Sequence, residues 1–202
     1  MSQPLRPPAT LTTQRLAGAA SIIFHPAVVM VGAAVVATGA AEGGARLRWQ
    51  ALGLTLAAAV VVMGYSAWQT RSGRWTHIDA SERHERAQLN RFASWLLLGI
   101  AAILAVLGSH RGIVAAIGLS GLIVLAGHLL RGWLKASLHV AFAMFAACIV
   151  WPHAAAFATL LVATVVVAWS RLVLRRHALR EVVAGAALGA VCGLVFQWGI
   201  AA

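Results

Sequence analysis

The segment SRLVLRRHALRE, residues 170–181, gathers four arginines, one histidine and one glutamate between two almost wholly apolar stretches. His177 and Glu181 are four residues apart, so on a helix they would share a face and the carboxylate could reach the imidazole. A carboxylate bound to one ring nitrogen fixes the histidine tautomer and leaves the other nitrogen able to attack an electrophile. The competing interpretation is a glutamate favoured by the helix dipole beside a solvated arginine cluster.

A second polar segment, KASLH at residues 135–139, lies where an apolar stretch begins. Lys135 and Ser137 can donate to phosphate oxygens, and a helix N-terminus adds backbone N–H groups that favour an anion. His139 could then protonate a leaving oxygen. Taken singly, His139 is typical of a packed, hydrogen-bonded histidine and Lys135 of a lysine that extends to the membrane surface.

The third polar segment, DASERHER at residues 79–86, contributes Arg83 and Arg86, three residues apart. Arginine binds phosphate through a planar, bidentate fork. Pairing of Glu82 with Arg86 on a helix is the alternative. Both interpretations can hold together, because a glutamate can orient an arginine that binds substrate.

The elements that must position these residues are membrane helices. The chain has 202 residues, of which 61% are hydrophobic and 10% charged, whereas a soluble domain carries about 25% charged residues. Long apolar runs predict an all-α polytopic helical bundle, because lipid offers no partner for unpaired backbone groups. A secretory signal peptide fits poorly, since the N-terminus is polar and rich in proline.

We predict a tail over residues 1–16 and a single transmembrane domain over 17–202, with six or seven transmembrane helices. The apolar segments are 17–41, 49–69, 93–109, 112–132, 137–152, 154–170 and 181–200, and a span needs about 20 residues. If successive segments form hairpins, the three polar loops meet on one side of the membrane. Seven tryptophans lie near segment ends, as an interfacial aromatic belt requires.

The charge balance restricts the partners. The net charge is +11, and because the arginines sit in short loops we expect anionic head groups or phosphates as partners rather than nucleic acid. Cys148 and Cys192 are interpreted as small apolar fillers, without metal-ligand spacing. Gly185, Gly189 and Gly193 favour close helix packing and leave an oligomer open.

In order and spacing, residues 79–189 resemble the type-2 phosphatidic acid phosphatase family, or lipid phosphate phosphatases. That family has the motifs K-x6-R-P, P-S-G-H and S-R-x5-H-x3-D. Ser170, Arg171, His177 and Glu181 match the third motif, with glutamate in place of aspartate.

The other two motifs match in part. Residues 136–139, ASLH, keep the serine and histidine of the second motif. Arg86 stands where the first motif has arginine, Ala87 replaces its proline, and Asp79 occupies its lysine position.

The resemblance implies a helical membrane bundle and metal-independent phosphomonoester hydrolysis, with no cofactor. It makes His177 the nucleophile that forms a phosphohistidine, Glu181 the group that orients it, and His139 the acid that protonates the leaving alkoxide. The groups that would hold the phosphoryl oxygens are Arg171, Ser137, Lys135, Arg83 and Arg86, with Arg83 or Lys135 replacing the missing lysine. The expected substrate is a lipid or prenyl phosphate or diphosphate.

Two further expectations concern sidedness and the rival function. Thirteen of the 16 basic residues fall on the side of the three loops, which the positive-inside rule makes cytoplasmic, in a bacterial inner membrane. Members of the resembled family often work on the outer face.

The alternative function is a non-catalytic lipid-binding scaffold or transporter with a degenerate phosphatase site. We interpret His25, His128 and His153 as structural, and His77, His84 and His110 as loop histidines.

Overall fold

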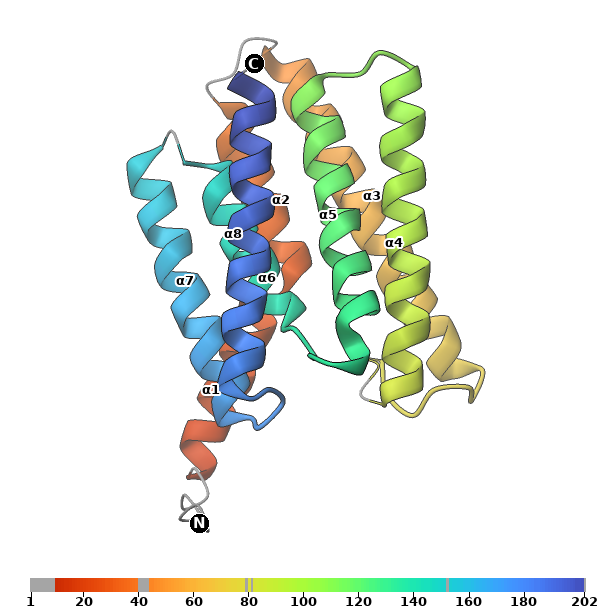
Figure 1. The fold of residues 1–202 in the computed structure, drawn as a ribbon, viewed down its shortest axis with the longest axis vertical. Coiled ribbons are helices and arrows are strands. Elements are labelled where there is room, and N and C mark those ends of the chain that lie inside the picture. Colours follow the sequence, from red (N-terminus) through yellow and green to blue (C-terminus); the bar gives the residue numbers. More distant parts are fainter. Residues whose placement is uncertain (1–9, 40–43, 79, 81, 152, 202) are drawn as a thin grey trace.

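The computed structural model describes residues 10–39, 44–78, 80, 82–151 and 153–201, and this part of the chain is helical without any strand. This confirms the predicted all-α fold class. The helices, drawn in Figure 1, are α1 (Leu11–Ile23), α2 (Pro26–Gly39), α3 (Gly44–Arg71), α4 (Arg83–Val106), α5 (Arg111–Leu129), α6 (Leu138–Ile149), α7 (Ala154–Val173) and α8 (Leu179–Ala201), with a short 3-10 helix, η1 (Leu130–Gly132), after α5.

Within the described ranges, five helices are long and apolar enough to cross a membrane: α3, α4, α5, α7 and α8. The bent pair α1–α2 adds a sixth span if the two helices cross together. The structure therefore supports the lower of the two predicted counts. The remaining apolar segment forms α6, whose 12 residues extend only about 18 Å, well short of a hydrocarbon core of about 30 Å.

The first apolar segment is two helices rather than one, with a 48° bend between them. The cause is local, because Pro26 has no N–H to donate and disfavours the helical conformation of the residue before it. His25 begins α2 instead: its carbonyl accepts the N–H of Val28 at 2.8 Å, and its Nδ1 accepts the N–H of Ala27 at 3.3 Å. The side chain of His25 thus caps the second helix.

The helices also extend into segments that the sequence analysis treated as polar connections. α1 begins at Leu11, inside the expected tail, whereas residues 1–9 lie outside the described part. α4 begins at Arg83, well before residue 93, because Glu82 and Glu85 form a capping box there. Only residues 174–178 separate α7 from α8.

α6 is the buried centre of the bundle, and α8 packs tightly along it. A Cβ atom added at Gly185 would lie 2.4 Å from the Ser137 carbonyl oxygen, and one at Gly189 would lie 2.2 Å from that of Ala141. The expected packing role of the glycine stripe is therefore confirmed, and its partner is a helix of the same chain. An oligomer would have to use another surface.

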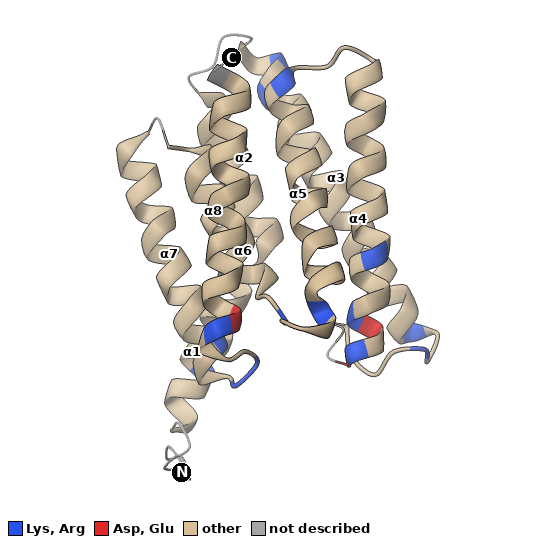
Figure 2. Ribbon diagram, in the orientation of Figure 1, with Lys and Arg blue, Asp and Glu red and all other residues tan. Residues whose placement is uncertain are grey.

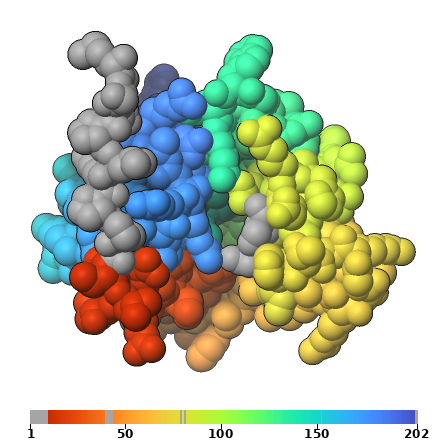
Figure 3. All heavy atoms as spheres, turned by 90° about the horizontal axis from the view of Figure 1, so that it is seen from below, coloured from red at the N-terminus to blue at the C-terminus, as the bar shows by residue number. Residues whose placement is uncertain are grey.

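The three polar loops lie at one end of the bundle, as hairpin topology predicts (Figures 1 and 2). Most lysines and arginines gather at this end, which we call the loop end (Figure 2). Seen from the loop end, the 174–178 loop, the segment before α6 and the start of α4 surround the middle of the face, and α1 lies beside the first of these (Figure 3). Residues from four separate regions therefore meet here.

Candidate functional site

The chain turn after α7 presents His177 towards the segment before α6. Arg175 takes a positive φ of 53°, and the N–H groups of Arg176 and His177 both point back to the Arg171 carbonyl, at 3.1 and 3.4 Å. This is the usual way to end a helix with a left-handed residue, here without a glycine. His177 consequently lies in the loop rather than on a shared helix with Glu181, which corrects our expectation, although the two side chains still meet.

The ring of His177 is held through one nitrogen. Its Nδ1 lies 2.9 Å from Oε2 of Glu181 and 3.2 Å from the Lys135 carbonyl oxygen. Both partners are acceptors, so the proton of the neutral ring resides on Nδ1 and the Nε2 lone pair is left for attack. Glu181 also accepts the N–H of Ala178 at 3.2 Å, and so it both caps α8 and orients the histidine.

Charges around His177 favour its neutral form. Burial lowers the pKa of His177 below its ordinary value, and Lys135 and Arg86 lower it further, against an opposing contribution from Glu181. A neutral imidazole is the nucleophilic form. The charge of Arg86, in the first turn of α4, thus acts on this ring.

Ser137 is the N-cap residue directly before α6 and is completely buried. Its N–H donates to the Glu181 carbonyl at 2.9 Å, which ties the start of α6 to the first turn of α8. Its hydroxyl has no hydrogen-bond partner among the described residues. A buried hydroxyl without a partner costs free energy, and at a helix N-terminus it is well placed to donate to an anion.

Lys135 connects two of the loops. Its Nζ donates to the Arg176 carbonyl at 3.1 Å, which leaves two of its three protons for other acceptors. Burial, and next the charge of Arg86, lower the pKa of Lys135 from its ordinary value. The side chain therefore braces the 174–178 loop as well as adding positive charge near His177.

His139 is the second residue of α6, and its ring meets that of His25 edge to face, with the centroids 5.3 Å apart and the planes at 89°. Burial and then the positive charge of Arg171 hold the pKa of His139 well below its ordinary value, and His177 and Arg176 lower it further. A bound phosphate would bring negative charge and reverse that bias. His139 follows two residues after Ser137, whose N–H donates to the Glu181 carbonyl, and Glu181 also binds His177, so both predicted catalytic histidines adjoin the junction of α6 and α8.

Arg171 is buried, with 3% of its surface exposed, and its Nη2 donates to the Ser21 hydroxyl. The preceding residue, Ser170, donates its hydroxyl to the Ala17 carbonyl at 2.8 Å. Burying a guanidinium is costly unless acceptors surround it. The interior position of Arg171 excludes the solvated-cluster interpretation for this residue, while Arg175, Arg176 and Arg180 are exposed.

The two arginines predicted from the first polar loop, Arg83 and Arg86, differ in burial and in their effect on the other site residues. Arg83 is exposed at the start of α4, whereas Arg86 is half-buried and acts on both Lys135 and His177. Glu85 is buried and binds the N–H and hydroxyl of Thr76, at 2.6 and 2.9 Å, so it fixes the loop rather than an arginine. Asp79 lies outside the described residues.

Our sequence reasoning missed Ser21 and His25 as neighbours of this site. We had interpreted His25 as a structural histidine, and it does cap α2, but it also contacts His139. The available signal was the His-Pro pair inside an apolar run, which marks a helix break where polar groups can gather.

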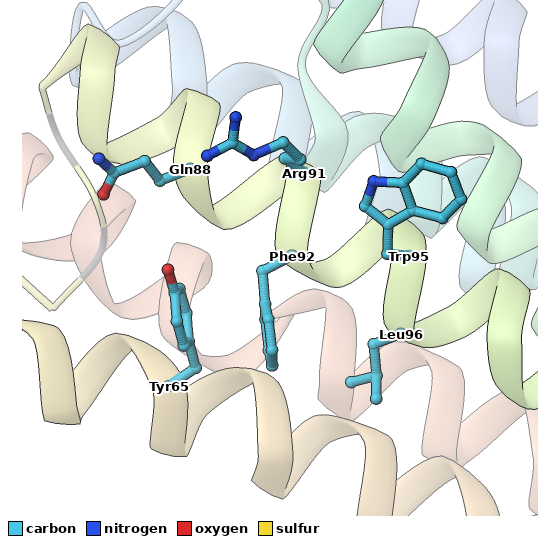
Figure 4. A pocket seen from close by; sticks show the side chains of 6 residues that line it. All are labelled: Tyr65, Gln88, Arg91, Phe92, Trp95 and Leu96. Carbon is cyan, nitrogen blue, oxygen red and sulfur yellow. The ribbon is translucent and has the colours of Figure 1, made fainter.

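A pocket of about 540 Å³ lies elsewhere and is lined by residues of α3 and α4 (Figure 4). Tyr65 and Phe92 stack in it, with ring centroids 4.0 Å apart, and Arg91 and Trp95 lie beside them. None of the predicted site residues lines this pocket, so it is separate from the two histidines.

In the described part of the chain, no three His, Cys, Asp or Glu residues gather to hold a metal ion.

No family model, no curated protein and no solved structure matches the chain.

Proposed function

We propose that this protein is a membrane phosphatase that removes phosphate from a lipid or prenyl phosphate or diphosphate through a phosphohistidine intermediate, without a metal. One observation carries the proposal: Nδ1 of His177 is engaged by the Glu181 carboxylate and the Lys135 carbonyl, so its Nε2 lone pair is free for attack. Nearby cations provide the charge that a phosphoryl group needs.

The reaction would proceed in two steps. Nε2 of His177 attacks phosphorus, the bond to the leaving oxygen breaks, and His139 gives that oxygen its proton. Glu181 stabilises the positive charge on the phosphorylated ring. His139, now neutral, then takes a proton from a water molecule while the oxygen of that water attacks phosphorus. The phosphorus–nitrogen bond breaks, which releases phosphate and restores the neutral His177.

The phosphoryl oxygens would be held by groups from all three loops. Ser137 offers a hydroxyl that has no partner among the described residues, and Lys135 and Arg86 offer positive charge that acts on His177. Arg171 supplies a buried guanidinium near His139. With the loop end at the lipid surface, an amphiphile would place its phosphate there and keep its tail among the apolar helices. We propose the cytoplasmic face of a bacterial inner membrane for the loop end, from the positive-inside rule.

The test is phosphate release by purified protein in detergent from a panel of lipid and prenyl phosphates, with EDTA present. We expect turnover that orthovanadate inhibits, no turnover by His177→Ala, and a turnover reduced about 100-fold or more by His139→Ala. Phosphate trapped on the protein by rapid acid-free quenching should depend on His177. A His177→Ala variant as active as the parent would refute the mechanism, and a parent without turnover on any substrate would favour a lipid-binding scaffold.

A further inference from the structure

The segment from Ala17 to His25, at the end of α1, touches the candidate site although it matches none of the three motifs. It makes contact with α7 through Ser21, which accepts from Arg171, and through the Ala17 carbonyl, which accepts from Ser170. It also reaches α6 through the ring of His25. The residues that α1 and α7 bring into contact are 150 or more positions apart in the sequence. These contacts are therefore features of the tertiary structure.

We propose that this segment is a wall of the active site, in which Ser21 positions the Arg171 guanidinium and His25 positions the His139 imidazole. The proposal rests on the phosphatase function proposed above. Both are positioning residues, because each acts on the substrate through another side chain.

Ser21 can orient Arg171 because both side chains are buried, with 8% and 3% of their surfaces exposed. A guanidinium is planar, so a hydrogen bond from one of its nitrogens restricts how the whole fork can rotate. The Ser170–Ala17 bond holds the same turn of α7 against α1. The fork is thereby aimed before substrate arrives, which reduces the cost of binding.

His25 can orient His139 because its own ring is immobilised. Its Nδ1 and its carbonyl oxygen are both committed to the cap of α2. The ring of His139 lies at 89° to this fixed surface, which restricts the rotation of its imidazole. Proton transfer needs the donor within hydrogen-bond reach of the leaving oxygen, so loss of this contact should affect turnover more than binding.

Ser21 is tested with orthovanadate, which mimics the phosphoryl group in transfer. We expect Ser21→Ala to raise the vanadate inhibition constant about tenfold, the effect of a lost hydrogen bond to a charged group, and Ser21→Thr to restore it. The matched control is Ser120→Ala, which removes an equally buried hydroxyl that only bonds the Ala116 carbonyl of its own helix. An unchanged inhibition constant in Ser21→Ala would overturn the role of Ser21.

His25 is tested with two variants that separate the cap from the ring. His25→Asn keeps a good helix cap but removes the ring, so we expect parent-like thermal stability and a kcat lowered about tenfold, with KM unchanged. His25→Phe keeps a ring against His139 but loses the cap, so it should be less stable and retain more kcat. The opposite order of kcat would mean that His25 only caps α2, and would overturn its role.

The two proposals fail in different ways. A parent protein that neither turns over lipid phosphates nor responds to vanadate refutes the phosphatase function, and the wall with it. An active, vanadate-sensitive parent whose Ser21→Ala and His25→Asn variants match it in every constant refutes the wall alone.

Discussion

Nδ1 of His177 lies 2.9 Å from the carboxylate of Glu181, although the histidine is in a loop and the glutamate is on α8. The glutamate is the longer homologue of the aspartate expected from the third motif. Its extra methylene does not prevent contact, because the backbone before α8 turns to bring the ring to the carboxylate. The pair therefore keeps the geometry that fixes a tautomer.

Replacement of Glu181 should separate charge from hydrogen bonding. Glu181→Gln keeps an acceptor for Nδ1 but removes the negative charge that stabilises a phosphorylated, positively charged ring, so we expect kcat to fall about 100-fold. Glu181→Asp keeps the charge and should stay within about tenfold of the parent. Steady-state kinetics on one lipid phosphate measure both. Equal losses in the two variants would contradict the charge argument.

The pH dependence should reflect His177. Burial lowers the pKa of His177 below its ordinary value, and the neutral ring is the form that attacks. The attacking form of His177 should therefore be complete above this lowered pKa and be lost as the pH drops through it, so the acidic limb of kcat/KM lies below about pH 6.5. The Glu181 hydrogen bond raises the pKa, so Glu181→Gln should move that limb to still lower pH. A limb that moves upward would contradict this assignment.

Ser137 should matter for function and not for stability. Its buried hydroxyl has no partner in the described part of the chain, so Ser137→Ala should leave the thermal midpoint unchanged or raise it. The same change should lower kcat/KM about tenfold if the hydroxyl donates to phosphate. Ser66→Ala is the control, because the Ser66 hydroxyl donates to the Ile78 carbonyl and its loss should lower the midpoint.

The packing of α8 on α6 gives a prediction that does not depend on chemistry. A Cβ at Gly189 would lie 2.2 Å from a backbone oxygen, so Gly189→Ala must separate the two helices and should cost about 1–3 kcal/mol of stability. Gly199→Ala, in the same helix, meets nothing within 4 Å and should not destabilise the fold. Unfolding in detergent measures both, and equal midpoints would contradict the close approach.

The sequence alone was sufficient for the fold class, because apolar runs and few charges allow only helices in lipid. It also located the loop end, since alternating hairpins place every second connection on one side. The pairing of His177 with Glu181 followed from their spacing, although the expected shared helix did not form.

Other features depended on tertiary structure. Pro26 in the sequence accounts for the bend at His25. The contact between the His25 and His139 rings, however, required α1 and α2 to pack against α6 and α7. Likewise, the sequence spacing gave no reason to distinguish Arg83 from Arg86. In the structure only Arg86 is half-buried and lowers the pKa of both Lys135 and His177. The periodicity and composition of a segment determine its local structure. Contacts between distant segments depend instead on how whole helices pack, and no local sequence pattern predicts that packing.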